Sequence, residues 1–252
     1  ARATWASNNY DTALLFYLDD SAGNLTEYMR LEKGLVGINC TATSAGGGAL
    51  QVSSATDTSR LRLTNTPTGA AATDGFEISM QGVDAYIENR ETGSIIMYNG
   101  GAALTIASDG AVKNPLQPAF LAKPASTQSD IAIDTEVTVV LGTEVFDQGG
   151  DFTSNTFTAP IAGRYQLNLI FRMQNMDSAS DYYNIRIKTS NRTHTFVVDP
   201  DYGQDTPYHA YSHSVLTDMD ASDTAYITIY QAGGTQQMDI STQTAFSGFL
   251  AC

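Results

Sequence analysis

The sequence predicts an all-β protein, and three observations carry that prediction. Charged residues make up only 16% of the chain, whereas surface helices favour Glu, Lys and Arg. The chain holds 21 Gly and 13 Tyr, residues that suit turns and strands. Turn dipeptides such as Asp74-Gly75 and Asn99-Gly100 separate short apolar or alternating runs. Apolar residues, at 42% of the chain, are numerous enough to build a core.

Residues 21–112 show strands that are short and scattered. Examples are Leu61-Arg62-Leu63, Phe76-Glu77-Ile78 and Ala85-Tyr86-Ile87. Pieces of two such strands bury little area within one chain and are marginal alone. We therefore expect sister chains to supply the missing burial, in an intertwined trimeric stalk of the β-prism or β-helix type.

A proline-containing linker over residues 113–118 follows the stalk. Pro115 and Pro118 favour an extended connector and disfavour helix. We place the domain border at this linker.

Residues 119–252 carry longer strands at regular spacing. Apolar and polar residues alternate cleanly over 165–171 and again over 225–230. Many such strands separated by polar turns predict a β-sandwich or jelly roll.

The same region carries a family signature. It comprises aromatic residues on successive strands, then a Pro, a Gly and a Tyr, and a closing strand with a Gly between phenylalanines: Phe152, Phe157, Pro160, Gly163, Tyr165, Phe246, Gly248 and Phe249. This set resembles the signature of the complement C1q head family, although Leu167 and Leu169 stand where that family usually has aromatic residues. The resemblance implies a jelly roll of ten strands, related to the tumour necrosis factor fold, that packs as a tight homotrimer.

Physical chemistry gives these positions a scaffold role. The bulky members are expected to fill the sandwich interior: Phe152, Phe157, Tyr165 and Phe249. Gly163 suits a tight turn, where a side chain costs strain. Gly248 indicates a close backbone approach or a bulge.

The N-terminal part carries a resemblance of its own. Its Gly- and Ser-rich strands, such as 49–52, 74–78 and 106–112, are similar to the region before the tip of bacteriophage tail fibres. The resemblance implies a virion fibre, made in the host cytoplasm, that attaches to a virion protein through residues 1–20. The head is then expected to contact a host surface glycan or outer-membrane protein.

Charge and cysteine content exclude several classes of partner. The formal charge of −14 argues against nucleic-acid binding, which needs Lys and Arg to displace counterions, and against anionic membrane surfaces. No apolar run is long enough to insert into a membrane. Cys40 and Cys252 form no ligand spacing, and free thiols are expected.

The sequence predicts no catalytic residues, hence a protein that is not an enzyme. The three histidines, His194, His209 and His213, accompany no Gly-x-Ser-x-Gly elbow. On a strand, His209 and His213 lie about 13 Å apart, too far to share an ion.

A loop of carboxylates leaves one cofactor question open. Asp199, Asp201 and Asp205 surround Gly203 and offer the oxygen ligands that Ca²⁺ prefers, without the EF-hand order. The alternative is that they are solvated turn residues. No cofactor is required by the predicted fold.

Tyrosines near loops are the expected recognition residues. Tyr182, Tyr183, Tyr202 and Tyr208 flank predicted loops, with Tyr211 nearby. A tyrosine offers a flat apolar face and a hydroxyl, which suit a sugar ring or a protein patch. The alternative is that part of this set faces the interior or the trimer seam.

Three other functions compete with a receptor-binding fibre. A capsid or head decoration fibre keeps the trimer and changes only the docking partner. A secreted trimeric ligand of the C1q and tumour necrosis factor type is disfavoured by the missing signal peptide and collagen repeat. A polysaccharide depolymerase needs paired carboxylates in a groove.

Overall fold

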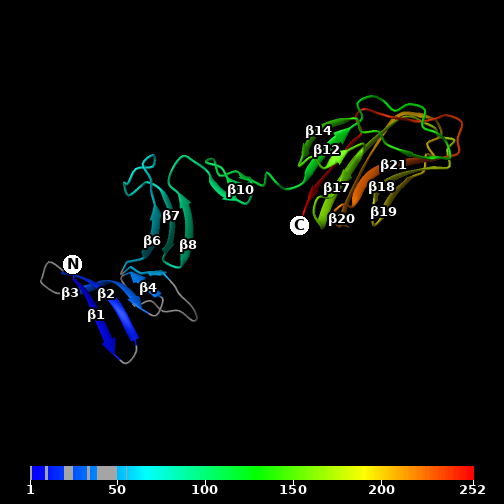
Figure 1. The fold of residues 1–252 in the computed structure, drawn as a ribbon. Coiled ribbons are helices and arrows are strands. Elements are labelled where there is room, and N and C mark those ends of the chain that lie inside the picture. The colour runs from blue at the N-terminus through cyan, green and yellow to red at the C-terminus, as the bar shows by residue number, and fades with distance from the viewer. Residues whose placement is uncertain (1, 9–10, 20–24, 33–34, 39–49, 55) are drawn as a thin grey trace. The chain divides into compact units, whose positions relative to one another are not determined.

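The computed structural model describes residues 2–8, 11–19, 25–32, 35–38, 50–54 and 56–252. Every regular element in these residues is a β-strand (Figure 1), so the predicted all-β class is confirmed. Nothing in the described ranges is a helix long and apolar enough to cross a membrane. Cys40 and the loop at 20–24 lie outside the described residues, whereas Cys252 is a free, exposed thiol.

The chain divides into two compact units. One comprises residues 1–96 and 106–112, and the other comprises residues 97–105 and 113–252.

Two sheets form most of the first unit. The larger has the strand order β1 (Arg2–Asn8), β2 (Asp11–Asp19), β3 (Leu25–Glu32), β4 (Leu35–Ile38), β5 (Leu50–Val52). The smaller is an antiparallel meander of β6 (Thr58–Leu63), β7 (Phe76–Gln81) and β8 (Asp84–Asn89). Gly82 has a φ of 60° in the tight turn between β7 and β8, a conformation that side chains disfavour. A further small sheet has the order β11 (Val112–Lys113), β10 (Ala102–Ile106), β9 (Ile95–Tyr98).

Residues 119–252, called the head from here on, form two sheets. The first has the order β14 (Thr143–Gln148), β12 (Ala119–Lys123), β23 (Ala245–Leu250), β17 (Gly163–Met176), β20 (Thr206–Met219), with β22 (Asp239–Ile240) beside β17. The second has the order β15 (Phe152–Thr153), β16 (Thr156–Thr158), β21 (Thr224–Ala232), β18 (Tyr182–Thr189), β19 (Thr193–Val198), with β13 (Glu136–Thr138) beside β21. One cluster of buried residues contains side chains of both sheets, so the head is a jelly-roll sandwich (Figure 1).

Stacked aromatic rings form the centre of the head. The ring centroid of Phe120 lies 4.6 Å from that of Phe157, 5.0 Å from that of Phe246 and 5.1 Å from that of Phe152. Tyr165 is also buried, and its hydroxyl donates a hydrogen bond of 2.8 Å to the carbonyl of Ile161. Aromatic pairs at these spacings contribute beyond their buried area.

Two glycines of the family signature stand where no side chain fits. A Cβ at Gly248 would lie 2.7 Å from Leu167 Cδ2 and 2.8 Å from Phe120 Cε1. A Cβ at Gly163 would lie 2.6 Å from Leu250 Cδ1. Pro160, which precedes this stretch, is exposed.

The structure corrects the expected place of Phe249. Successive side chains of a strand point to opposite faces, and in β23 Phe246 and Gly248 face the interior. Phe249 therefore points outward and is 46% exposed. The close approach of Phe120 and Leu167 to Gly248 fills the interior space that Phe249 was expected to occupy.

Candidate functional site

The outer face of the first head sheet carries four large apolar side chains among polar ones such as Gln166 and Asn168. Phe146, Ile170, Leu216 and Phe249 are each 46–54% exposed there. On the central strands Phe249 pairs with Gln166, which pairs in turn with Leu216, so the two apolar side chains flank one glutamine. Four exposed large apolar side chains on one sheet face make this face a candidate interaction surface. We call these four residues the outer apolar face.

A row of stacked rings lies where the edge strands β19 and β20 face each other. The His209 ring stacks with those of Tyr202 and Tyr211, with ring centroids 5.3 Å and 4.5 Å away. Phe196 of β19 continues the row, at 5.3 Å from Tyr211 and 5.9 Å from His213. The structure thus brings residues of both sheets together in one aromatic row.

The hydroxyls of this row are paired as well. Those of Tyr202 and Tyr211 lie 2.8 Å apart in a hydrogen bond. Burial, followed by this hydrogen bond and the neighbouring phenol charge, raises the pKa of Tyr211. The Tyr211 phenol is therefore neutral near pH 7 and presents a hydrogen-bonding group rather than charge.

Tyr208 lies on the outer side of β20 and is exposed. The guanidinium of Arg172 lies over its ring, 4.9 Å from the centroid. Such a cation–π contact holds the ring in place while leaving its edge and hydroxyl open to solvent.

A second group of aromatics lies on the outer face of the second head sheet. Tyr182 is exposed, and its ring stacks with that of Tyr230 at 6.2 Å. Arg186 lies 6.0 Å from the centre of the Tyr230 ring and donates a hydrogen bond of 2.8 Å to Glu136. Glu136 also accepts a 2.8 Å hydrogen bond from Thr228, so this face combines tyrosines with a fixed ion pair.

The structure corrects the expected role of Tyr183. Its side chain is fully buried, because it shares the inward face of β18 with Ile185 and Ile187. The hydroxyl accepts a hydrogen bond of 2.9 Å from the backbone N–H of Asp177 and donates one of 3.1 Å to the carbonyl of the same residue. Burial raises the pKa of Tyr183. Tyr183 is a core residue, and its side chain does not lie at the surface where recognition was expected.

The carboxylate loop is not assembled as an ion site. In the part of the chain that the structure describes, no three His, Cys, Asp or Glu side chains are grouped so as to hold a metal. Asp199, Asp201 and Asp205 are exposed, and Asp205 accepts hydrogen bonds from the N–H and hydroxyl of Ser178 at 3.0 and 2.8 Å. At this loop the structure shows no grouped set of acidic side chains for Ca²⁺.

Sequence reasoning missed several members of the two aromatic groups. His209, Tyr230 and Arg186 were not expected at a site. A signal for one of them existed, because the alternation over 225–230 places Tyr230 on the face opposite Ile227 and Ile229. Stacking of His209 with two tyrosines depends on the loop that carries Tyr202, and no residue pattern reveals it.

This sandwich, with ring-filled interior and signature glycines, is a C1q/TNF-like jelly roll. The sequence profile of the C1q domain matches residues 119–251, and the chain belongs to the C1q domain family. The resemblance read from the sequence is confirmed for this region.

Solved structures with a similar fold include two kinds of protein. The globular domain of zebrafish complement 1qA is 15% identical, with a TM-score of 0.40, over 54% of this chain and 98% of that one. Murine APRIL is 13% identical, with a TM-score of 0.38, over 53% of this chain and 98% of that one. No curated protein matches the chain.

Proposed function

We propose that this chain is a homotrimeric, non-enzymatic adhesin of a virion fibre, whose head recognises a receptor on the surface of a host cell. The observation that carries the proposal is the outer apolar face. Full burial of one Phe, Leu or Ile side chain stabilises by about 1.5–3 kcal/mol, so covering the exposed halves of four contributes several kcal/mol. Copies of the same head are the partners that are always available to cover it.

The exposed tyrosines support receptor recognition. Tyr182, Tyr202 and Tyr208 are exposed, and each is held by a neighbouring ring or guanidinium. A ring held in this way loses little conformational entropy when it binds, which favours contact with a sugar ring or a protein patch. Three heads in one trimer multiply weak contacts into firm attachment.

A secreted trimeric ligand is the second candidate, and the C1q domain match is what favours it. Both candidates use the same trimeric head and differ in the surface that it meets. Fluorescently labelled full chain would be applied to a panel of bacterial strains and to cultured animal cells. The adhesin proposal expects saturable binding to a subset of the bacteria. Binding to the animal cells alone would favour the ligand.

Pretreatment of the cells identifies the class of receptor. Loss of binding after periodate oxidation indicates a glycan, and loss after protease treatment indicates a protein. The double variant Tyr202→Ala, Tyr208→Ala is expected to bind at least about tenfold more weakly, as hot-spot aromatics do. Tyr98→Ala, an exposed tyrosine outside the head, is the matched control. Wild-type binding by the double variant, or no bound strain at all, contradicts the proposal.

The trimer itself is tested with a charge on the outer apolar face. Ile170→Asp places a carboxylate in the surface that three heads are proposed to cover, and it is expected to weaken assembly by at least about tenfold. Val197→Asp, equally exposed on β19 of the other sheet, is the control. Native mass spectrometry over a dilution series measures the assembled mass of both variants. Equal masses for the two variants count against this face as the head interface.

A further inference from the structure

The β6–β8 sheet has two unlike faces. The strand register places Leu61 beside Ile78 and Ile78 beside Ile87, so these side chains share one face. Arg62 pairs with Glu77, and Glu77 pairs with Glu88, on the other face. One face of this sheet is therefore apolar and the other is charged.

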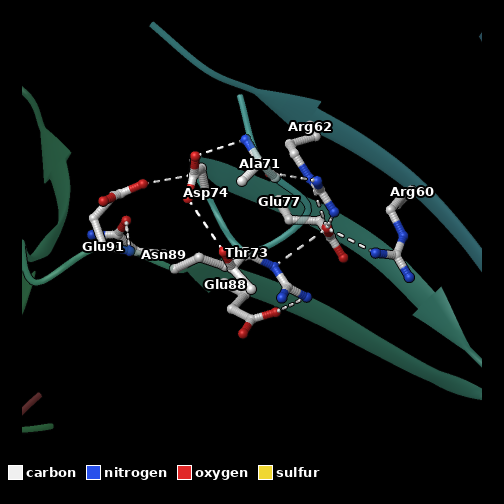
Figure 2. Close-up of polar contacts among 11 residues, drawn as sticks. Arg60, Arg62, Ala71, Thr73, Asp74, Glu77, Glu88, Asn89 and Glu91 are labelled. Atoms are coloured by element: carbon white, nitrogen blue, oxygen red, sulfur yellow. Dashed lines mark hydrogen bonds and ion pairs between the residues drawn. The ribbon is translucent and has the colours of Figure 1, made fainter. Parts of the chain in front are cut away.

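The charged face is closed within the chain. The Glu77 side chain is fully buried, and Figure 2 shows Arg60 and Arg62 directed at it. Arg62 donates hydrogen bonds to Glu77 Oε2 from Nη2 at 3.0 Å and from Nε at 3.3 Å. Arg60 Nη1 and Arg90 Nε each lie 3.5 Å from the same oxygen. Glu88 in turn forms an ion pair of 2.9 Å with Arg90.

The charge state of this cluster follows from its geometry. Burial opposes ionisation of Glu77, but the hydrogen bond from Arg62 and the positive charges of Arg60 and Arg90 outweigh it. The pKa of Glu77 therefore lies below its ordinary value. An ionised, buried carboxylate surrounded by three guanidiniums makes the middle of this face ionic, and Tyr86 is its one exposed large apolar side chain among the described residues of β6–β8.

The apolar face is open. It has five large side chains that are each 45–59% exposed: Leu61, Leu63, Ile78, Met80 and Ile87. A groove of about 250 Å³ continues it past β6 to Leu50 and Val52. Within the described residues of the first unit, no second layer covers these side chains. An uncovered apolar sheet face of this kind marks an interaction surface.

The distribution of charge over the chain indicates which partner covers this apolar face. The nine residues whose side chains share this face on β6, β7 and β8 include no ionised group: Ser59, Leu61, Leu63, Phe76, Ile78, Met80, Ala85, Ile87 and Asn89. The whole chain carries −14, so copies repel each other over most of their surface. A neutral, apolar face is where like-charged copies approach without that cost. It is also self-complementary, because apolar surface covers apolar surface.

We infer that copies of this chain meet through the apolar face of the β6–β8 sheet, and that the Glu77 cluster keeps the opposite face outward. This inference rests on the proposed trimer and adds to it a second contact, separate from the head. Interior and exterior are exchanged relative to an ordinary sheet: the side buried within the chain is ionic, and the side left for partners is apolar.

Cross-linking of the full chain tests the inference. Ile87 and Tyr86 are adjacent in β8, both are exposed, and their side chains point to opposite faces. Ile87→Cys and Tyr86→Cys would each be made with Cys40→Ser and Cys252→Ser, then treated with a short bis-maleimide. Ile87→Cys is expected to give at least about tenfold more linked chains than Tyr86→Cys, because only Ile87 lies on the proposed contact face.

Native mass spectrometry of the same samples separates the two proposals. A trimer in which Ile87→Cys does not link, or links no more than Tyr86→Cys, overturns the inference and leaves the proposed head trimer standing. Chains of 27.0 kDa overturn both.

A pair of aspartate variants, one on each face of the sheet, gives a second measurement that needs no cross-linker. Ile87→Asp is expected to raise amide hydrogen exchange in β6–β8 by at least about tenfold while the head keeps the chains together. Tyr86→Asp is expected to leave that exchange within about twofold of wild type. Equal exchange in the two variants contradicts the inference.

Discussion

The head and the β6–β8 sheet bury opposite kinds of residue. Among the residues that the structure describes, every buried apolar side chain except Leu15 belongs to the head. The β7 strand instead buries Glu77 and Ser79, while Ile78 and Met80 between and beside them are exposed. Both regions use the same alternation of side chains along a strand. The difference is that the head has a second sheet to close its interior, whereas β6–β8 has none among the described residues of its own unit.

This contrast separates two sources of stability. A sandwich with a closed interior gains its free energy of folding within one chain. A single sheet with one open apolar face gains part of its stability only when another surface covers it. Substitutions in the interior of the head should therefore lower stability at every protein concentration. Substitutions on the open face of β6–β8 should lower stability only by weakening assembly.

The largest effect is expected at the centre of the head. Phe120→Ala removes a ring that contacts Phe152, Phe157 and Phe246, and should lower the free energy of unfolding by about 3–5 kcal/mol. Chemical denaturation followed by tyrosine fluorescence measures it. Val197→Ala, on an exposed position of β19, should cost less than about 0.5 kcal/mol. Similar costs for the two variants contradict the described core.

The next effect is local to β6–β8. Glu77→Gln removes the buried carboxylate charge that three guanidiniums share, and Arg90 then keeps only Glu88. Amide exchange in β7 should therefore rise at least about tenfold. Glu88→Gln alters the cross-strand neighbour, which is partly exposed, and should change exchange by less than about threefold. Hydrogen-exchange mass spectrometry compares the variants peptide by peptide. A matching response in both variants would remove the special role given to Glu77.

A pH effect follows from the same carboxylate. The pKa of Glu77 lies below the ordinary value of 4.5, so its contribution to stability is fully present above pH 4.5. That contribution is lost as the pH falls through the lowered pKa of the folded state. Protection factors in β7, corrected for intrinsic exchange, should therefore fall below pH 4.5 in the wild type and stay flatter in Glu77→Gln. A wild-type profile that matches the variant would show that Glu77 is not held ionised.

The smallest effect is expected at the aromatic row. Tyr202→Phe removes the 2.8 Å hydrogen bond to Tyr211 at an exposed site, and should cost no more than about 1 kcal/mol. It should also lower the pKa of Tyr211, which burial alone then raises. Ultraviolet titration of the phenols against wild type measures the shift. An unchanged or higher Tyr211 pKa would contradict the pairing of the two hydroxyls.

Much of the head was predictable from alternation. Tyr165, Leu167, Leu169 and Phe171 all face the interior, as their spacing of two requires. The same rule, applied to β18, would have assigned Tyr183 to the interior with Ile185 and Ile187. The prediction that Phe249 is buried was wrong because the size of its side chain was given more weight than its position in the alternation along the strand. Gly248, which shares the inward parity of Phe246, shows that a glycine can hold an interior position while the next phenylalanine points to solvent.

The ionic core of β6–β8 could not be predicted in the same way. Alternation in β7 places Glu77 opposite Ile78 and Met80, which favours an exposed glutamate. Its burial depends on Arg62 of β6 and on Arg90 after β8, which reach it only through the strand register. Register between strands is set by packing and turns, not by local composition.

The mass of the full chain in solution tests the account most directly. Light scattering at micromolar concentration should give about 81 kDa, three times the 27.0 kDa of one chain, because both apolar faces then lie between copies. A stable species of 27.0 kDa, folded and soluble with both faces exposed, would contradict it.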